Sequence, residues 1–317
     1  MELACFVQSL TLTLTVIGIY ALTVWIYETF KSPIGILWGL SKQCICDVNF
    51  TERYGQWAVI SGGSDGIGRQ YARFFARKGL NIVIIALPDE ILKQTAEEIE
   101  STFHVQVKQI SADFSKGFEL SDYLKNELDD LDVGVLVNNV GVANTLPVYY
   151  ETCALSLYQR MVNVNINAAV ILSHIILQRM KQRRRGLLIN IASVAGLRPL
   201  PLGLMYSATK AFMASFSNAL REELADFGIE CQTVTPYFVA TSMTEELRVD
   251  RFLRIISSDV ETYGKFLTMI VGKTAQTTGY WLHGLTLTAI NLLPADLTIK
   301  VAFEAAKSWI KKKNLTD

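Results

Sequence analysis

The stretch VISGGSDGIGRQYARFFARKG, residues 59–79, places Gly62, Gly66 and Gly68 between a β-branched run and an amphipathic segment. Without a Cβ at these positions, the backbone can turn tightly and approach a pyrophosphate at the positive end of the following helix. The spacing G-x-x-x-G-x-G differs from the commoner dinucleotide fingerprint. A glycine turn that follows a strand and opens a helix is nevertheless typical of dinucleotide binding. The stretch therefore predicts the first βα unit of a nucleotide-binding fold.

Short β-branched runs alternate with amphipathic segments on both sides of this turn. We expect strands at WAVISGG (57–63), NIVIIA (81–86), VQVKQI (105–110), VGVLVNN (133–139), GLLINIAS (186–193) and IECQTVTP (229–236). We expect helices at 66–78, 89–103, 118–129, 154–182 and 206–227. Continuous apolar strands separated by helices indicate a parallel sheet covered on both faces. The pattern predicts an α/β fold with a doubly wound, Rossmann-like parallel sheet in one domain, residues 51–280.

The N-terminal segment from Leu3 to Tyr27 carries no charged residue. As a helix it would be about 37 Å long, enough for a bilayer core of about 30 Å. Glu2 precedes it, and no convincing cleavage site follows, which favours an uncleaved membrane anchor (1–50, with its juxtamembrane segment) over a signal peptide. Basic residues follow the span and none precedes it, so we expect the main domain on the cytoplasmic side.

The C-terminal segment, residues 281–317, is apolar but is interrupted by Pro294, Asp296 and Lys300. These residues favour a helical tail that packs on the domain or lies in the membrane interface over a second crossing. The terminal lysines, 311–313, could meet anionic head groups, and a solvated tail is the alternative.

The composition restricts the class of partner. Lys+Arg and Asp+Glu are equal at 30 each, so the basic excess typical of nucleic-acid binding is absent. Charged residues make up only 19% against an ordinary share of about a quarter, which fits a protein attached to membrane lipids. Five cysteines form an odd set without a paired framework and favour a reducing compartment. The three histidines show no metal-ligand spacing, so we expect no metal site.

Several motifs in order resemble the short-chain dehydrogenase/reductase family over about residues 56–242. SGGSDGIG (61–68) is similar to the family's TGxxxGIG turn, with Ser61 in place of Thr, and NNVG (138–141) is similar to NNAG. NVNIN (163–167) supplies Asn165, NIASVAG (190–196) supplies Ser193, and YSATK (206–210) supplies Tyr206 and Lys210. Ser193 precedes Tyr206 by thirteen residues, the family's common spacing.

The resemblance implies a role for each of these residues. Tyr206 would be the general acid/base, Ser193 would bind the substrate oxygen, and Asn165 would join a water-linked proton relay with Lys210. The spacing of Tyr206 and Lys210 puts both on one face of a helix. A nearby ammonium that lowers the phenol pKa by about three units would supply roughly 4 kcal/mol of preference for the phenolate. We therefore expect a lowered Tyr206 pKa.

The resemblance also assigns the cofactor contacts. Asp113 would lie at the adenine, Thr241 near the nicotinamide, and Lys210 against the nicotinamide ribose beside Tyr206. The turn and the cofactor wall would be formed by Ser61, Gly62, Ser64, Asp65, Gly66, Ile67, Gly68 and Asn139.

The sequence bears on the choice of cofactor through the end of the second strand. IIALPDE (84–90) has no acidic residue placed to hold a ribose 2′-hydroxyl, which favours NADP(H), with NAD(H) as the alternative. Leu87 stands where NADP enzymes of the family often have arginine, and Arg69 is either a phosphate partner or an ordinary surface residue. Tyr237 replaces the family's usual glycine after Pro236, so we expect a differently shaped nicotinamide loop.

Within the family, the chain resembles the membrane-bound branch of 17β-hydroxysteroid dehydrogenases and very-long-chain 3-oxoacyl-CoA reductases. The resemblance rests on the apolar N-terminus and on the motifs NNVG, PYFVAT (236–241) and TTGYWLHG (277–284). The similarity extends to hydroxysteroid dehydrogenase-like protein 1, described as inactive where the tyrosine is lost; Tyr206 is present here. The resemblance implies NADPH-dependent interconversion of a ketone and a secondary alcohol on a steroid or fatty acyl-CoA. It also implies an endoplasmic reticulum membrane location, with the mitochondrial outer membrane as alternative, and leaves a homodimer open.

Residues 245–273 should shape the substrate pocket, and Ser258 with Glu261 predicts a helix capping box there. The competing functional hypothesis is a non-catalytic membrane protein that binds nucleotide or lipid and acts as an organiser.

Overall fold

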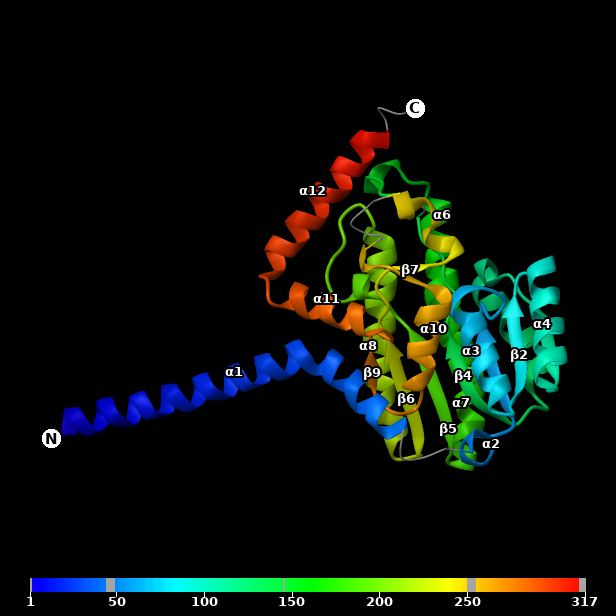
Figure 1. Ribbon diagram of the computed structural model, residues 1–317, viewed down its shortest axis with the longest axis horizontal. Coiled ribbons are helices and arrows are strands. Elements are labelled where there is room, and N and C mark those ends of the chain that lie inside the picture. Colours follow the sequence, from blue (N-terminus) through cyan, green and yellow to red (C-terminus); the bar gives the residue numbers. More distant parts are fainter. Residues whose placement is uncertain (1, 44–48, 145, 250–254, 314–317) are drawn as a thin grey trace.

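The computed structural model describes residues 2–43, 49–144, 146–249 and 255–313 (Figure 1). Its centre is a parallel seven-stranded sheet in the order β3-β2-β1-β4-β5-β6-β9. The strands are β1 (Trp57–Ser61), β2 (Asn81–Ala86), β3 (Val107–Ser111), β4 (Val133–Asn138), β5 (Gly186–Ile191), β6 (Ile229–Val234) and β9 (Gln276–Thr277). The strand order reverses between β1 and β4, and a crevice at such a reversal is where doubly wound sheets bind ligands.

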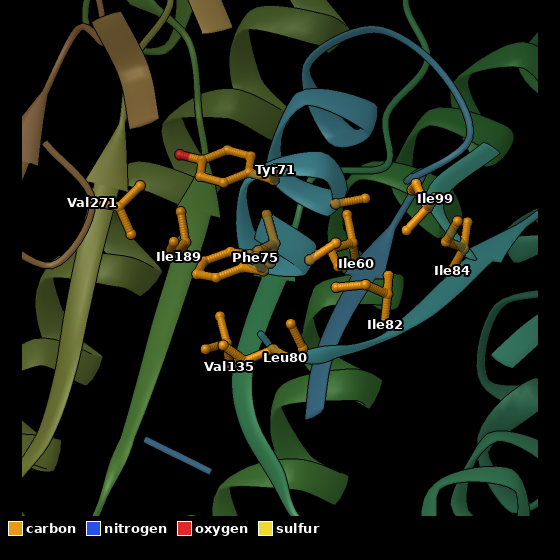
Figure 2. Close-up of a cluster of buried hydrophobic side chains, with 14 of the residues drawn as sticks. Ile60, Tyr71, Phe75, Leu80, Ile82, Ile84, Ile99, Val135, Ile189 and Val271 are labelled. Atoms are coloured by element: carbon orange, nitrogen blue, oxygen red, sulfur yellow. The ribbon is translucent and has the colours of Figure 1, made fainter. Parts of the chain in front are cut away.

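Helices cover both faces of the sheet (Figure 1). They are α3 (Gly66–Arg77), α4 (Glu90–Phe103), α5 (Ser121–Leu128), α6 (Leu155–Val162), α7 (Ala168–Arg183), α8 (Leu204–Ala225) and α10 (Val260–Met269). Alternate side chains of each strand enter two separate cores: Ile60 packs with Tyr71 and Phe75 (Figure 2), whereas the neighbouring Val59 packs with Leu172 on the other face. The predicted doubly wound α/β fold is confirmed.

The structure differs from the predicted elements in three places. The helix expected over 154–182 is α6 and α7 joined by a π-type turn, Asn163–Asn167. The helix expected over 118–129 is a 3₁₀ segment, Phe114–Leu120, followed by α5. The sequence reading also missed β9 and the short parallel pair β7 (Val239–Ala240) and β8 (Ser258–Asp259), because two-residue strands carry no periodic signal.

The predicted capping box at Ser258 is wrong. Ser258 belongs to β8, and the N-cap of α10 is Asp259, whose carboxylate accepts a hydrogen bond from Thr262 N at 2.8 Å. This bond lowers the pKa of Asp259. An ionised acceptor at a helix start is favoured further by the helix dipole.

The first part of the N-terminal helix α1 (Glu2–Gln43) extends away from the domain (Figure 1). Its segment Phe6–Tyr27 is long and apolar enough to cross a membrane, and none of it is buried in the protein. Within the described residues, Leu155–Arg183 is also long and apolar enough, but it is 56% buried and forms part of the core. A short α2 (Phe50–Arg53) leads into β1.

The C-terminal helices α11 (Trp281–Asn291) and α12 (Ala295–Lys313) meet at a bend of 115°. The later part of α1 packs against α11, where Thr288 Oγ1 donates a hydrogen bond to Thr29 O at 3.1 Å, and against β9. These contacts hold the base of the candidate span on the β9 edge of the sheet.

Candidate active site

The glycine turn connects β1 to α3. Gly62 and Gly66 have φ angles of +64° and +55°, which a side chain would strain. An added Cβ at Gly68 would overlap the carbonyl oxygen of Gly62 and lie 2.6 Å from Asn139 Nδ2. The turn is therefore closed tightly by residues that tolerate no Cβ.

Hydrogen bonds between the ends of β1 and β4 shape this turn. Ser61 Oγ accepts from the N–H groups of Asn139 at 3.0 Å and Val140 at 3.2 Å. The amide Nδ2 of Asn139 donates to the carbonyls of Ser61 and Gly62, both at 3.0 Å. On the other side, Thr95 of α4 donates to Ser64 O at 2.8 Å. The turn is thus preorganised by its neighbours.

The start of α3 is suited to an anion. Asp65 occupies the N-cap position, but its side chain makes no cap hydrogen bond and instead accepts from Ser242 Oγ at 2.9 Å. The first-turn N–H groups, which begin with Gly66 and Ile67, therefore keep their partial positive charge for a ligand. An added Cβ at Gly66 would lie 3.1 Å from Thr241 Cγ2, which places Thr241 beside the turn. This geometry fits the pyrophosphate of a nicotinamide dinucleotide.

Two other residues considered for cofactor binding have protein partners. Asp113 accepts a hydrogen bond from Ser115 N at 2.9 Å, and this bond lowers the pKa of its carboxyl. Arg69 forms an ion pair with Glu98 of α4, which also accepts from Arg73 Nε at 2.8 Å. Arg69 is thus held by a carboxylate through one of its terminal nitrogens, whereas its buried Nε has no hydrogen-bond partner among the described residues.

Tyr206 and Lys210 lie on the first turns of α8. Lys210 Nζ is 5.8 Å from the centroid of the Tyr206 ring and donates to Ile191 O at 2.9 Å. Lys210 is only 4% exposed, and burial lowers its pKa to about 8. Burial also raises the pKa of Tyr206, although a hydrogen bond with Ser193 acts in the opposite direction. The expected lowering of the phenol pKa is therefore not met in this structure, because desolvation outweighs the stabilising contacts.

Ser193 follows β5 and is held close to α8. Its Oγ accepts from Ala195 N at 3.1 Å and can donate to Pro236 O at 3.4 Å. Ser207 Oγ of α8 donates to Ala195 O at 2.7 Å. The loop also packs closely on the helix backbone, because a Cβ at Gly196 would lie 2.6 Å from Ala211 N. These contacts set the position of the Ser193 hydroxyl relative to Tyr206.

Asn165 lies in the π-type turn and is buried. Its Oδ1 accepts from Val142 N at 2.7 Å, and its Nδ2 donates to Val142 O and to Thr209 Oγ1, both at 2.9 Å. Thr209 in turn donates to Tyr206 O at 2.8 Å. An added Cβ at Gly141 would lie 3.6 Å from both Asn165 Oδ1 and Lys210 Nζ, so these groups meet at one point. The sequence reading missed Thr209, although its position within YSATK placed it there.

His283 is a second residue that the sequence reading missed. It is fully buried on α11, and its Nδ1 accepts from Tyr237 N at 3.3 Å in the loop after β6. The rings of Tyr263 and Tyr280 lie 5.5 Å and 5.2 Å from it, centroid to centroid. Burial lowers the pKa of His283 to about 4, so the imidazole is neutral near pH 7. Among the described residues, no cluster of three or more His, Cys, Asp or Glu is arranged to hold a metal.

Comparison with known proteins agrees with this arrangement. The short chain dehydrogenase family model matches residues 56–251. The chain is 40% identical to rat 17-beta-hydroxysteroid dehydrogenase type 3 over 78% of this chain and 80% of that one. It is 34% identical to rat very-long-chain 3-oxoacyl-CoA reductase over 89% and 90% of the two chains. It is also 37% identical to human inactive hydroxysteroid dehydrogenase-like protein 1, over 78% of this chain and 75% of that one.

Solved structures share the fold. A 7beta-hydroxysteroid dehydrogenase superposes with a TM-score of 0.73 at 22% identity, covering 80% of this chain and 99% of that one. A short-chain dehydrogenase from Sphingobium yanoikuyae in complex with NADPH gives a TM-score of 0.56 at 25% identity, covering 79% of this chain and 84% of that one. With the family match, the relatives and the dinucleotide-shaped turn in agreement, the chain belongs to the short-chain dehydrogenase family and is a nicotinamide dinucleotide-dependent oxidoreductase.

Proposed function

We propose that the protein is an NADPH-dependent enzyme that interconverts a ketone and a secondary alcohol on a hydrophobic substrate, a 3-oxoacyl-CoA or a 17-ketosteroid. The observation that carries this proposal is that buried Lys210 lies with its Nζ 5.8 Å from the Tyr206 ring on α8, and that the loop carrying Ser193 is packed on the same helix. The named activities of two relatives, a 17-beta-hydroxysteroid dehydrogenase and a very-long-chain 3-oxoacyl-CoA reductase, support the substrate class.

The proposed chemistry follows from these side chains. The bound nicotinamide supplies or accepts the hydride. Ser193 orients the substrate by donating a hydrogen bond to its oxygen. Tyr206 Oη gives a proton to that oxygen during reduction and removes it during oxidation. Asn165 supports the relay side of the site through its bonds to Val142 and Thr209.

The protonation states in this structure are those from which reduction starts. A phenol whose pKa is raised by burial is protonated at neutral pH, although the same shift makes it a weaker acid until a nearby charge stabilises the phenolate. Lys210, with a pKa of about 8, is mostly charged at pH 7 and would stabilise the phenolate that forms. Donor and counter-charge are therefore both present in the state that reduction requires.

The turn of residues 61–68, with Asn139 and Thr241 beside it, would hold the cofactor's phosphates and nicotinamide end, and Asp113 would lie at the adenine. We favour NADP(H) because exposed Leu87 directly follows β2, and the next carboxylate, Asp89, caps α4 by accepting from Leu92 N at 2.9 Å. Arg69 would have to exchange its partner Glu98 for the 2′-phosphate. Titration of the protein with NADPH and NADH checks this preference, and tighter binding of NADH would refute it.

The location is proposed from α1. Residues Phe6–Tyr27 would cross the endoplasmic reticulum membrane once and leave the domain on the cytoplasmic side, with the mitochondrial outer membrane as the alternative. In this division the anchor is 1–50, the catalytic domain 51–280 and the helical tail 281–317. Extraction of membranes with alkaline carbonate should leave the full-length protein in the pellet. Its release into the supernatant would contradict a spanning helix.

The decisive experiment measures NADPH consumption by the full-length protein in detergent with a panel of ketosteroids and 3-oxoacyl-CoAs. Replacement of Tyr206 by Phe should reduce turnover about 100-fold or more without weakening NADPH binding. Tyr123→Phe, at an exposed tyrosine on α5, is the matched control. If wild type and Tyr206→Phe bind NADPH and consume it equally slowly, the non-catalytic organiser is the better explanation.

A further inference from the structure

A cavity of about 410 Å³ lies between α1, α8, β9 and α11. It is lined neither by the glycine turn nor by Tyr206, Ser193 or Lys210. Its volume is within the range of about 300–1,000 Å³ typical of small-molecule sites. Figure 1 shows α1 passing close to α11, two of the elements whose residues line this cavity.

Several residues that line the cavity carry hydrogen-bond donors. Among the described residues, the Arg198 side chain makes one hydrogen bond, from its Nη2 to Asn291 Oδ1 at 3.4 Å, and no carboxylate there pairs with it. The Oδ1 of Asn218 accepts from Arg221 Nη2 at 3.0 Å and from Gln276 Nε2 at 2.7 Å, which leaves its amide nitrogen as a donor. The cavity thus presents a cation and amide donors but no acidic residue.

Apolar residues that line the cavity adjoin the candidate span. Trp25, 46% exposed, belongs to the last turn of Phe6–Tyr27, and Leu197, 42% exposed, faces the same cavity with Leu287 of α11. Tryptophan is favoured at the boundary between hydrocarbon and head groups. If α1 crosses a bilayer, the cavity therefore opens at the depth of the lipid phosphates.

We propose that this cavity binds the head group of a phospholipid. The guanidinium of Arg198 pairs with the lipid phosphate, since its planar donors match phosphate oxygens. Asn218 and Asn291 contribute amide hydrogen bonds, and the acyl chains leave past Trp25 along the exposed apolar side of α1. The lipid source of the phosphate rests on the proposed membrane anchorage, whereas the anion site itself does not.

The test uses the full-length protein, freed of endogenous lipid in detergent and without cofactor. Binding of dioctanoyl phosphatidylglycerol is measured by native mass spectrometry for wild type, Arg198→Gln and the matched control Arg77→Gln on α3. We expect saturable binding that Arg198→Gln weakens roughly tenfold or more and Arg77→Gln leaves unchanged. Unaltered NADPH binding shows that Arg198→Gln is folded.

Three outcomes would overturn the proposal. Equal binding of dioctanoylglycerol, which lacks phosphate, would reduce the site to an apolar groove. Equal binding of the phospholipid by Arg198→Gln would remove the phosphate pair. Displacement by inorganic phosphate at the same affinity as the lipid would assign the site to the free anion. Tyr206→Phe should retain lipid binding, so failure of the catalytic proposal and failure of this one are separate observations.

Discussion

Replacement of Gly68 by alanine tests whether the turn between β1 and α3 is closed as tightly as the structure has it. The new Cβ would overlap the carbonyl oxygen of Gly62 and lie 2.6 Å from Asn139 Nδ2, whereas ordinary contacts begin at 3.4 Å. The carbonyl oxygen of Gly62 belongs to the backbone and cannot move away by side-chain rotation. The amide of Asn139 would have to withdraw by roughly an ångström, since overpacked sites relax by such shifts.

The cost can be worked from the bonds that this shift breaks. Asn139 Nδ2 donates to the carbonyls of Ser61 and Gly62, both at 3.0 Å. Losing two such bonds costs about 2 kcal/mol, and the residual strain costs about 1–3 kcal/mol. Because the bonds shape the surface that would receive the cofactor's pyrophosphate, a loss of about 2 kcal/mol in cofactor binding corresponds to roughly 30-fold weaker affinity.

Titration of NADPH fluorescence gives the affinity, and thermal unfolding gives the stability. Gly35→Ala is the control, because its nearest neighbours, at 3.6 Å and 3.9 Å, leave room for a Cβ. The NADPH affinity and the melting temperature of Gly35→Ala should both be close to those of wild type. Binding of NADPH by Gly68→Ala within threefold of wild type, at an unchanged melting temperature, would refute the reasoning.

Three further predictions concern stability. Burial holds the pKa of Lys210 near 8, below its ordinary 10.5. The charged lysine therefore lowers the stability of the fold at neutral pH, and this cost fades as the pH rises from 8 to 10.5. Replacement of Lys210 by Met should raise the melting temperature at pH 7 while abolishing turnover. The pKa of His283 is lowered from 6.5 to about 4 in the folded protein. As the pH falls from 6.5 to 4, the unfolded chain is protonated at this histidine before the folded protein is, so the free energy of unfolding decreases by up to about 3 kcal/mol. Chemical denaturation across pH 4–6.5 should show a smaller decrease for His283→Gln. Removing the cap with Asp259→Ala should cost about 1 kcal/mol of unfolding free energy, and an equal cost for Ser258→Ala would contradict the corrected cap.

Much of the fold was readable along the chain. The glycine turn, the alternation of strands and helices and the uncharged span all depend on local periodicity, which a linear sequence displays directly. The four-residue spacing of Tyr206 and Lys210 likewise determines their common helix face. Where the signal was short or ambiguous, as at β9 or between adjacent Ser258 and Asp259, the prediction failed or was absent.

Tertiary packing decided the rest, because it joins residues that are distant in the chain and removes water from them. Only the folded chain brings His283 to the backbone of Tyr237 and Thr209 to Asn165. Desolvation also reversed the expected shift of the Tyr206 pKa, because the loss of water around the phenol outweighs the Ser193 hydrogen bond, and this desolvation exists only after folding.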